Sequence, residues 1–212
     1  GAAIAETLAH AGARVTVMGR SEAPLKQVAK QHKAIGYTCC DVTDADTVKS
    51  AFREARGVNG AVDMIIANAG AAESKPFAKT SASEFQTMLD VNLTGVFNIW
   101  QAALADMKAA KAGRMIVVAS TAGLKGFPYV AGYCAAKHGV VGLTRALSLE
   151  LAKTGITVNA ICPGFIETPM LERSVDNIVA TTGMSTQDAV KSLTKGNPQG
   201  RLIQTDEVAA TA

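Results

Sequence analysis

Short apolar runs alternate with helical segments along almost the whole chain. The apolar runs are rich in β-branched residues, as buried strands are, and the segments between them carry apolar residues at helical spacing. Strands are predicted over residues 14–18, 37–40, 61–67, 115–119 and 156–161, and helices over residues 22–33, 44–56, 83–111 and 131–152. Strands that alternate with helices of about ten or more residues predict an α/β fold, with a Rossmann-like, doubly wound parallel sheet and helices on both faces.

Length and charge indicate one domain without a nucleic-acid or membrane partner. The chain has 212 residues, 48% of them hydrophobic, which is enough for one sizeable core, and we predict a single domain over residues 1–212. The net charge is only +3, and no Lys/Arg run suited to nucleic acid or an anionic membrane occurs. Because no apolar run reaches about 18 residues and no signal-peptide layout opens the sequence, we expect a cytoplasmic protein.

The four cysteines lack the spacing of a metal site. Cys39, Cys40, Cys134 and Cys162 form no C-x-x-C pair and lie in or beside predicted core elements. We therefore expect reduced, buried thiols and predict no metal centre.

Tyr133 and Lys137 are four residues apart in the helix predicted over residues 131–152. This spacing places both side chains on one helix face, where an ammonium group can favour the ionised phenol and lower the tyrosine pKa from its usual value of about 10. A tyrosine with a lowered pKa can transfer a proton near neutral pH. The alternative is a chance pair on a solvated face, and the neighbouring motifs decide between the two.

Ser120 comes directly after the buried strand predicted over residues 115–119. Its hydroxyl is therefore expected at the carboxyl end of that strand. Ligands of open parallel α/β sheets bind beyond those ends, so Ser120 and the first turn of the Tyr133 helix can share one crevice.

Several separated motifs together resemble the short-chain dehydrogenase/reductase family. In chain order they are Ala67-Asn68-Ala69-Gly70, Asn92 within Val91-Asn92-Leu93-Thr94-Gly95, Ser120, Tyr133, Lys137 and Pro163-Gly164. The match runs through the whole chain in one order and spacing. The resemblance implies that both ends are cut, so that a central first strand, most of the glycine-rich phosphate loop and the last strand are missing, and that Gly1 is the last glycine of that loop.

The resemblance implies a nicotinamide cofactor, and the sequence favours NADP over NAD. A glycine at a helix N-terminus, here Gly1, lets a pyrophosphate approach unpaired N–H groups. At the end of the strand over residues 14–18, an acidic residue would bind the ribose 2′-hydroxyl of NAD. The chain has Gly19-Arg20-Ser21 there instead, and the Arg20 guanidinium suits the 2′-phosphate of NADP. Arg20 could also be an ordinary exposed cation, and NAD stays possible.

Two stretches after predicted strands match positions that contact the cofactor in the family. Asp41 and Val42 match the adenine site, although Asp41 could equally cap the turn before the next helix, which we expect Thr43 to cap. Asn68, Ala69 and Gly70 follow the next strand, and their small size would let the backbone approach the cofactor. Asn68 could alternatively hold neighbouring strands by hydrogen bonds.

A third stretch, after the strand over residues 156–161, matches the segment that meets the nicotinamide. It contains Pro163, Gly164, Ile166 and Thr168, and Thr168 could alternatively be the N-cap of a helix that begins at Pro169. Residues 165–200 form a long insertion with two short helical patterns, which we interpret as a substrate lid or, alternatively, as a packing or subunit-contact arm.

The family resemblance assigns catalytic roles to four residues. Tyr133 donates the proton, Ser120 holds the carbonyl oxygen, Lys137 lowers the Tyr133 pKa and binds the nicotinamide ribose, and Asn92 fixes a water that leads to Lys137. Hydride transfer to a carbonyl needs such a proton donor and an oxygen-stabilising hydrogen bond.

The expected substrate is a 3-oxoacyl thioester, on a carrier protein or CoA. Residues 137–170 are similar to bacterial 3-oxoacyl-thioester and polyketide ketoreductases of the family. Family members that act on free 3-hydroxybutyrate hold its carboxylate with Gln, His and Lys, and this chain has Ala72, Ala122 and Val130 at those positions. The alternatives are an NAD(P)-dependent dehydrogenase of another secondary alcohol, such as 3-hydroxybutyrate or a sugar alcohol, and, more distantly, a non-catalytic nucleotide-sensing protein.

The helices over residues 83–111 and 131–152 carry more apolar residues than one buried stripe requires. Phe97, Trp100 and Leu149 are among these residues. Family members pair these two helices with symmetry mates, so we expect a homotetramer. The alternative is that Trp100 and its neighbours face the sheet.

Overall fold

A computed structural model describes the whole chain, residues 1–212, and shows five strands and nine α-helices. The strands are β1 (Val15–Gly19), β2 (Ile35–Cys39), β3 (Met64–Ala67), β4 (Gly113–Val118) and β5 (Ile156–Ile161). The helices are α1 (Ala2–His10), α2 (Glu22–Ala29), α3 (Ala45–Asn59), α4 (Ala82–Leu89), α5 (Gly95–Ala110), α6 (Ala131–Leu151), α7 (Pro169–Thr182), α8 (Thr186–Thr194) and α9 (Thr205–Thr211). None of these helices is both long and apolar enough to cross a bilayer.

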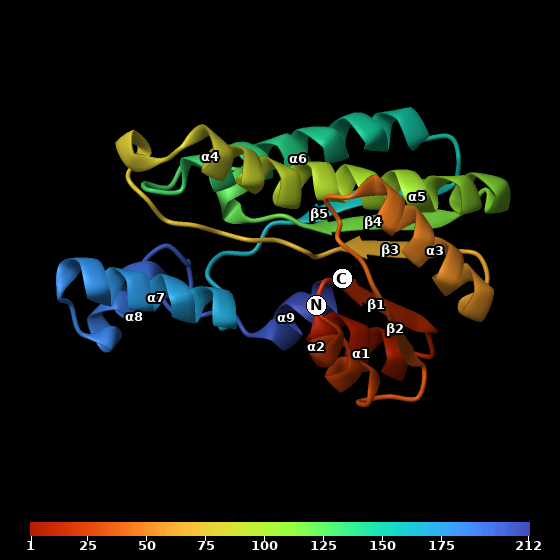
Figure 1. The fold of residues 1–212 in the computed structure, drawn as a ribbon, viewed down its shortest axis with the longest axis horizontal. Helices are drawn as coiled ribbons and strands as arrows, with labels where there is room; N and C mark the ends of the chain where they lie inside the picture. The colour runs from red at the N-terminus through yellow and green to blue at the C-terminus, as the bar shows by residue number, and fades with distance from the viewer.

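All strand pairs are parallel, which confirms the predicted α/β class. Strand β1 pairs with β2, and β3, β4 and β5 pair in that order. Helices α5 and α6 cover one face of the three-stranded sheet, while α1 and α2 pack against β1 and β2 (Figure 1). Because parallel strands share a direction, their carboxyl ends open onto one side of the molecule.

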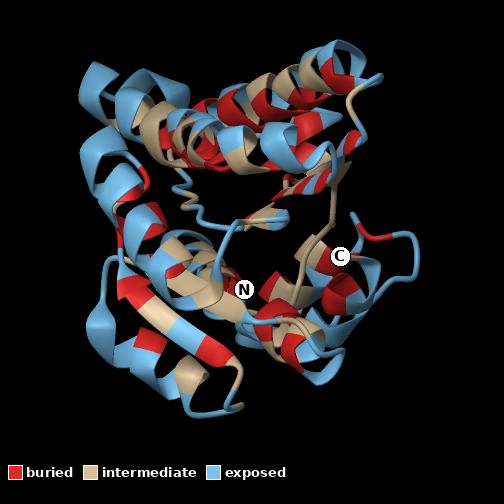
Figure 2. Cartoon of the chain, turned by 90° about the vertical axis from the view of Figure 1, so that its right-hand side faces the viewer, coloured by how far each residue is buried: buried red, intermediate tan, exposed pale blue.

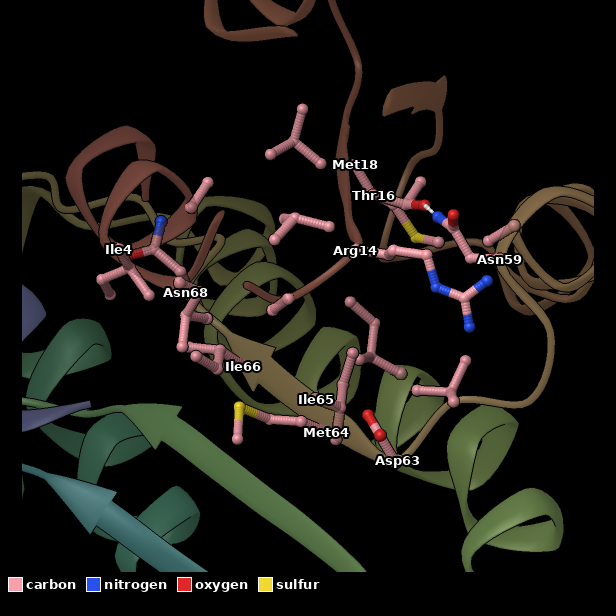
Figure 3. Close-up of a pocket in the computed structure, with 18 of the residues that line it drawn as sticks. Ile4, Arg14, Thr16, Met18, Asn59, Asp63, Met64, Ile65, Ile66 and Asn68 are labelled. Carbon is pink, nitrogen blue, oxygen red and sulfur yellow. Dashed lines mark hydrogen bonds between the residues drawn. The ribbon is translucent and has the colours of Figure 1, made fainter. Parts of the chain in front are cut away.

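The strands form two sheets, separated by an apolar slot between β1 and β3. The slot has a volume of about 820 Å³ and runs between side chains such as Met18 of β1 and Ile65 and Ile66 of β3 (Figure 3). Its only drawn hydrogen bond joins Asn59 Nδ2 to Thr16 Oγ1 at 2.9 Å.

Most of the core lies on the three-stranded side of this slot. The largest cluster of buried apolar residues has 19 members, and it joins α3, α5 and α6 to β3, β4 and β5. Two smaller clusters of three residues each lie under α1 and between α7 and α8. In Figure 2 the buried positions accordingly gather on the sides of the helices and strands that turn inward.

The long helix predicted over residues 83–111 is interrupted. Helix α4 ends at Leu89, a π-helical turn spans Asp90–Thr94, and α5 begins at Gly95. The apolar spacing runs through the interruption, so the sequence pattern shows one helix. The extra residue of a π turn changes the direction of its side chains, and such turns are frequent at functional sites.

Two smaller expectations are wrong. The N-cap of α3 is Asp44, whose carboxylate accepts hydrogen bonds from the Asp46 and Thr47 N–H groups, because the Thr43 hydroxyl donates to Asp41 instead. Cys39 is exposed at the carboxyl end of β2, although Ile35, on the same face of the strand, is buried.

Candidate active site

Ser120 and helix α6 meet at the carboxyl end of strand β4. Strand β4 ends at Val118, and a short 3₁₀ turn, Thr121–Gly123, follows Ser120 and packs against α6. The Thr121 N–H donates to the Pro163 carbonyl at 2.8 Å, which brings the segment after β5 to the same edge. The structure therefore assembles at one edge the segments that the sequence analysis assigned to catalysis and nicotinamide binding.

Lys137 is a buried cation fixed by the end of β4. Its side chain crosses from α6, and Nζ donates to the Val118 carbonyl at 2.9 Å. The same Nζ lies 5.6 Å from the centroid of the Tyr133 ring. Only 4% of the residue is exposed, and this burial lowers the pKa of Lys137 from 10.5 to about 8.

The pKa of Tyr133 moves in the direction opposite to the predicted one. Burial raises the pKa of Tyr133 above 10, and hydrogen bonding with Ser120 offsets only part of this rise. Lys137 contributes no lowering, because its ammonium group bonds to the Val118 carbonyl rather than to the phenol oxygen. The expectation that Lys137 lowers the Tyr133 pKa is thus wrong for the protein in this state, although the two side chains are adjacent as predicted.

Ser120 connects the strand end to the turn that follows. It has an extended backbone, and its Oγ accepts a hydrogen bond from the Ala122 N–H at 3.0 Å. The hydroxyl proton stays free for another acceptor, since Oγ is the acceptor in this bond. Ser120 can therefore donate to Tyr133 or to a substrate oxygen.

Asn92 is fully buried in the π-helical turn and fastens the segment after β3. Its Nδ2 donates to the Ala71 carbonyl at 2.9 Å and to the Met88 carbonyl at 3.0 Å, and its Oδ1 accepts from the Ala71 N–H at 3.2 Å. A Cβ at Gly70 would lie 3.0 Å from Asn92 Oδ1 and 3.9 Å from Lys137 Nζ. Asn92 and Lys137 thus both approach Gly70, and a water between them stays a prediction.

The predicted adenosine side of the site lies at the carboxyl ends of β1 and β2. Arg20 follows β1 and is near Asp41, whose pKa is lowered mainly by hydrogen bonds from Thr43 and further by the Arg20 charge. Val42 is buried, and its carbonyl accepts from Asn98 Nδ2 at 2.9 Å. Asp41 caps its turn, as its alternative interpretation proposed.

The predicted pyrophosphate side lies at the N-terminus of α1. Gly1 is the N-cap of α1, and a Cβ there would come within 2.7 Å of Asn68 Nδ2. Asn68, Ala69 and Gly70 are exposed at the end of β3. The Asn68 side chain makes no hydrogen bond in the structure, so its predicted alternative role of holding neighbouring strands is not seen.

The segment predicted to meet the nicotinamide is held by contacts with residues 197–203. Ile166 forms a parallel bridge with Ile203, and Thr168 is the N-cap of α7 with Pro169 at the first helical position. Asn197, to which the sequence analysis assigned no role, binds both backbone groups of Phe165. An asparagine between a glycine and a proline is typical of an exposed turn, so its burial had no signal in the sequence.

The segment read as a lid forms helices α7 and α8 with a small core of their own. Leu171, Val175 and Ala189 are buried between the two helices. Two contacts join this unit to the candidate site: Asn177 Nδ2 donates to the Ser74 carbonyl at 3.4 Å, and the Phe165 ring meets the Phe127 ring edge-on at 5.9 Å.

The buried ammonium predicts a pH-dependent stability. The folded pKa of Lys137 is about 8 and the unfolded value is near 10.5, so between these values the unfolded chain binds more protons than the folded chain. We expect the free energy of unfolding of the wild type, relative to Lys137→Met, to rise as the pH increases from 8 to 10.5. Denaturant titrations at several pH values measure this difference. The exposed Lys153→Met is the control and should give a difference independent of pH, and a flat difference for Lys137→Met would contradict the assigned burial of charge.

A family model and individual relatives all place the chain in the same protein family. The family model described as short chain dehydrogenase matches residues 1–179. A Streptomyces violaceoruber protein named as ketoacyl reductase 1 of the granaticin polyketide synthase is 41% identical over 216 residues, which cover 99% of this chain and 79% of that protein. A D-beta-hydroxybutyrate dehydrogenase of Cupriavidus necator is 34% identical over 217 residues, covering 100% of this chain and 84% of that protein.

A solved structure shows the same architecture. An actinorhodin polyketide ketoreductase variant with NADPH superposes with a TM-score of 0.94 at 36% identity, and the match covers 99% of this chain and 83% of that one. The chain therefore belongs to the short-chain dehydrogenase family, whose members are NAD(P)-dependent oxidoreductases that act on CH–OH and C=O groups.

Proposed function

We propose that this protein is an NADPH-dependent reductase of 3-oxoacyl thioesters, carried by an acyl carrier protein or CoA. In the reaction the carbonyl carbon gains a hydride and the carbonyl oxygen gains a proton, which yields the 3-hydroxyacyl thioester. The observation that carries the proposal is the convergence of Ser120, Tyr133 and Lys137 at the end of β4, beside a segment without a carboxylate-binding side chain.

Because the site lacks a side chain that could bind a carboxylate, thioester substrates are favoured over free hydroxy acids. Ala72, Ala122 and Val130 stand at the positions where relatives acting on 3-hydroxybutyrate use polar or charged groups, and Ala122 is buried. A free carboxylate would lose its hydration without gaining a partner there, which is costly. A thioester carries no such charge. The similarity to a D-beta-hydroxybutyrate dehydrogenase keeps another secondary alcohol as the second candidate.

The residues after β1 fit the 2′-phosphate of NADPH. Ser21 is the N-cap of α2 but makes no capping hydrogen bond, so its hydroxyl and the first N–H groups of α2 are available to an anion. Arg20 adds a guanidinium. Of the two nearby carboxylates, Glu22 is paired with Lys26 at 3.0 Å and accepts from the Tyr37 hydroxyl at 3.2 Å, and Asp41 accepts two hydrogen bonds from Thr43.

The remaining cofactor contacts are assigned to residues around the same edge. We assign the pyrophosphate to the N-terminus of α1 at Gly1 and the adenine to Asp41 and Val42. Bound NADPH would supply the hydride. The rest of the cofactor would meet Asn68, Ala69 and Gly70 along β3 and Pro163, Gly164, Ile166 and Thr168 after β5, with Tyr133 and Lys137 at the nicotinamide ribose.

The chain's own side chains supply the proton and stabilise the oxygen. Tyr133 is protonated at neutral pH, since burial raises its pKa, so it can donate to the carbonyl oxygen. Ser120 donates a second hydrogen bond to that oxygen. Lys137 can exchange its bond to the Val118 carbonyl for one to the cofactor ribose, and its positive charge would then stabilise the phenolate that remains after Tyr133 gives up its proton.

Asn92 and the lid complete the site. Asn92 keeps the segment after β3 against the π-helical turn, and we propose a water between Asn92 and Lys137 as the path for proton replacement. Residues 165–200 would close over the acyl chain. We place the protein in the cytoplasm, where its four free cysteines stay reduced.

Turnover of a substrate panel tests the proposed function. We expect the purified protein to oxidise NADPH with 3-oxoacyl thioesters faster than with free 3-oxo acids, simple ketones or sugars. Tyr133→Phe should lower kcat by about 10²- to 10⁴-fold with little change in NADPH affinity, because it removes the transferable proton and few cofactor contacts. Lys137→Ala should impair both. NADPH binding without turnover of any compound would favour a nucleotide-sensing role.

Cofactor preference tests the assignment of Arg20. We expect Gly19→Asp combined with Arg20→Leu to shift the ratio of kcat/KM from NADPH towards NADH by roughly tenfold or more, because a carboxylate repels the 2′-phosphate and accepts from a 2′-hydroxyl. Arg14→Leu, on the opposite end of β1, is the control and should leave the ratio unchanged. A wild type that already prefers NADH would contradict the premise.

We propose a homotetramer formed through α5 and α6. Trp100 and Val96 are buried in the core, so some of the additional apolar residues of these helices face the sheet. Phe97 and Leu149 remain exposed, at 47% and 80%, on the outer sides of α5 and α6. Helix α6 carries Tyr133 and Lys137, and Asn92 lies in the π-helical turn directly before α5, so pairing with a second copy would brace the site.

Light scattering at micromolar concentration tests the assembly. We expect a tetramer mass for the wild type and a smaller species for Leu149→Glu. Assembly would bury the new carboxylate between copies without a partner, which is unfavourable. Val58→Glu, at a position that is 74% exposed on α3, is the matched control and should keep the wild-type mass. A monomeric wild type would refute the proposal.

A further inference from the structure

Asn197 is a buried amide whose hydrogen bonds are directed at one peptide segment. Only 4% of the residue is exposed. Its Oδ1 accepts from the Phe165 N–H at 2.9 Å, and its Nδ2 donates to the Phe165 carbonyl at 3.0 Å and to the Arg201 carbonyl at 2.7 Å. The side chain thus binds both backbone groups of Phe165, as a neighbouring strand would, and Oδ1 is the sole partner of the Phe165 N–H.

The segment around Phe165 is held from two sides. On one side the Pro163 carbonyl accepts from the Thr121 N–H, next to Ser120. On the other side is Asn197, whose own N–H donates to the Thr194 carbonyl at the end of α8 at 2.9 Å. Asn197 therefore joins the end of the lid to the segment that we assign to the nicotinamide.

Gly164 shows how closely Asn197 approaches this segment. A Cβ at Gly164 would lie 2.1 Å from Asn197 Oδ1 and 3.1 Å from its Cγ, and the next neighbour, Ile203 Cδ1, is 3.7 Å away. Without the Asn197 side chain, a methyl group at Gly164 would have ordinary van der Waals distances. The glycine is thus required at this position by Asn197 itself.

We propose that Asn197 is a positioning residue that fixes the peptide planes on either side of Phe165, so that the backbone from Pro163 to Ile166 presents its polar groups to the nicotinamide half of the cofactor. This inference rests on the proposed function. An amide is suited to this task because it offers one acceptor and two donors in a single plane. Loss of the side chain leaves the partly buried Phe165 N–H without its partner, and the segment would move to find another.

Comparing the affinity for whole NADPH with the affinity for a fragment that lacks the nicotinamide distinguishes a positioning role of Asn197 from general structural support. We expect Asn197→Ala to weaken NADPH binding roughly tenfold, and to leave the affinity for 2′-phospho-ADP-ribose, which lacks the nicotinamide, within about twofold of wild type. Gln199→Ala, in the same loop at an exposed position, is the matched control and should change neither affinity. Equal weakening of both ligands by Asn197→Ala would overturn the proposal.

A double-mutant cycle tests the contact with Gly164. Gly164→Ala should weaken NADPH binding in the wild type, but should add little in the Asn197→Ala background, where the clash is absent. Additive effects of the two substitutions would show that Gly164 and Asn197 act separately and would contradict the proposal.

Hydrogen exchange tests the positioning without any cofactor. The Phe165 amide should exchange faster in Asn197→Ala than in wild type, while the amides of β4 keep their rates, because only the former loses its acceptor. Unchanged exchange at Phe165 would overturn the proposal directly. If the wild type fails to bind NADPH while Phe165 exchange accelerates as expected, the proposed function fails and the nicotinamide role of Asn197 with it, although the backbone contact is confirmed.

Discussion

The hydrogen bond from the Lys137 ammonium to the Val118 carbonyl determines the geometry of the candidate site. It ties α6 to the last residue of β4, and it does so at a buried position where a charged group is expensive unless it is bonded. Tyr133 lies one helical turn before Lys137, and Ser120 lies two residues after Val118. This buried contact therefore helps to set where the phenol and the hydroxyl lie relative to each other, and the same burial lowers the pKa of Lys137.

The same contact explains why the tyrosine pKa is raised and not lowered. The ammonium group donates its hydrogen bond to a backbone carbonyl. Burial removes water from the Tyr133 hydroxyl, and Ser120 is its hydrogen-bond partner. A shift of Lys137 away from Val118, towards a ribose hydroxyl and the phenol, would change both pKa values together. Spacing on a helix shows that two side chains share a face, but it does not show which third group competes for the charge.

The sequence predicted the elements whose signal is local and missed those that depend on a distant partner. Alternating apolar runs located all five strands to within a few residues, and the carboxyl ends of β4 and β5 carry Ser120 and Pro163 near the same edge as expected. The π-helical turn at Asn92 was missed because its apolar spacing continues through it, and the cap of α3 because Thr43 bonds to Asp41 instead. Asn197 was missed because nothing near it in sequence shows that its amide is buried against Phe165.

The distribution of the core indicates how the parts of the site can move. The elements that carry the proposed catalytic residues pack on the 19-residue cluster, whereas α7 and α8 are packed around three buried residues of their own. A unit with so small a core, joined to the rest by an aromatic contact and a few hydrogen bonds, opens at a lower free energy than the sheet does. Asn197 lies at that boundary, where the end of α8 meets the segment after β5. If residues 165–200 close over the substrate as we propose, Asn197 would couple that movement to the segment after β5, because its side chain binds both backbone groups of Phe165.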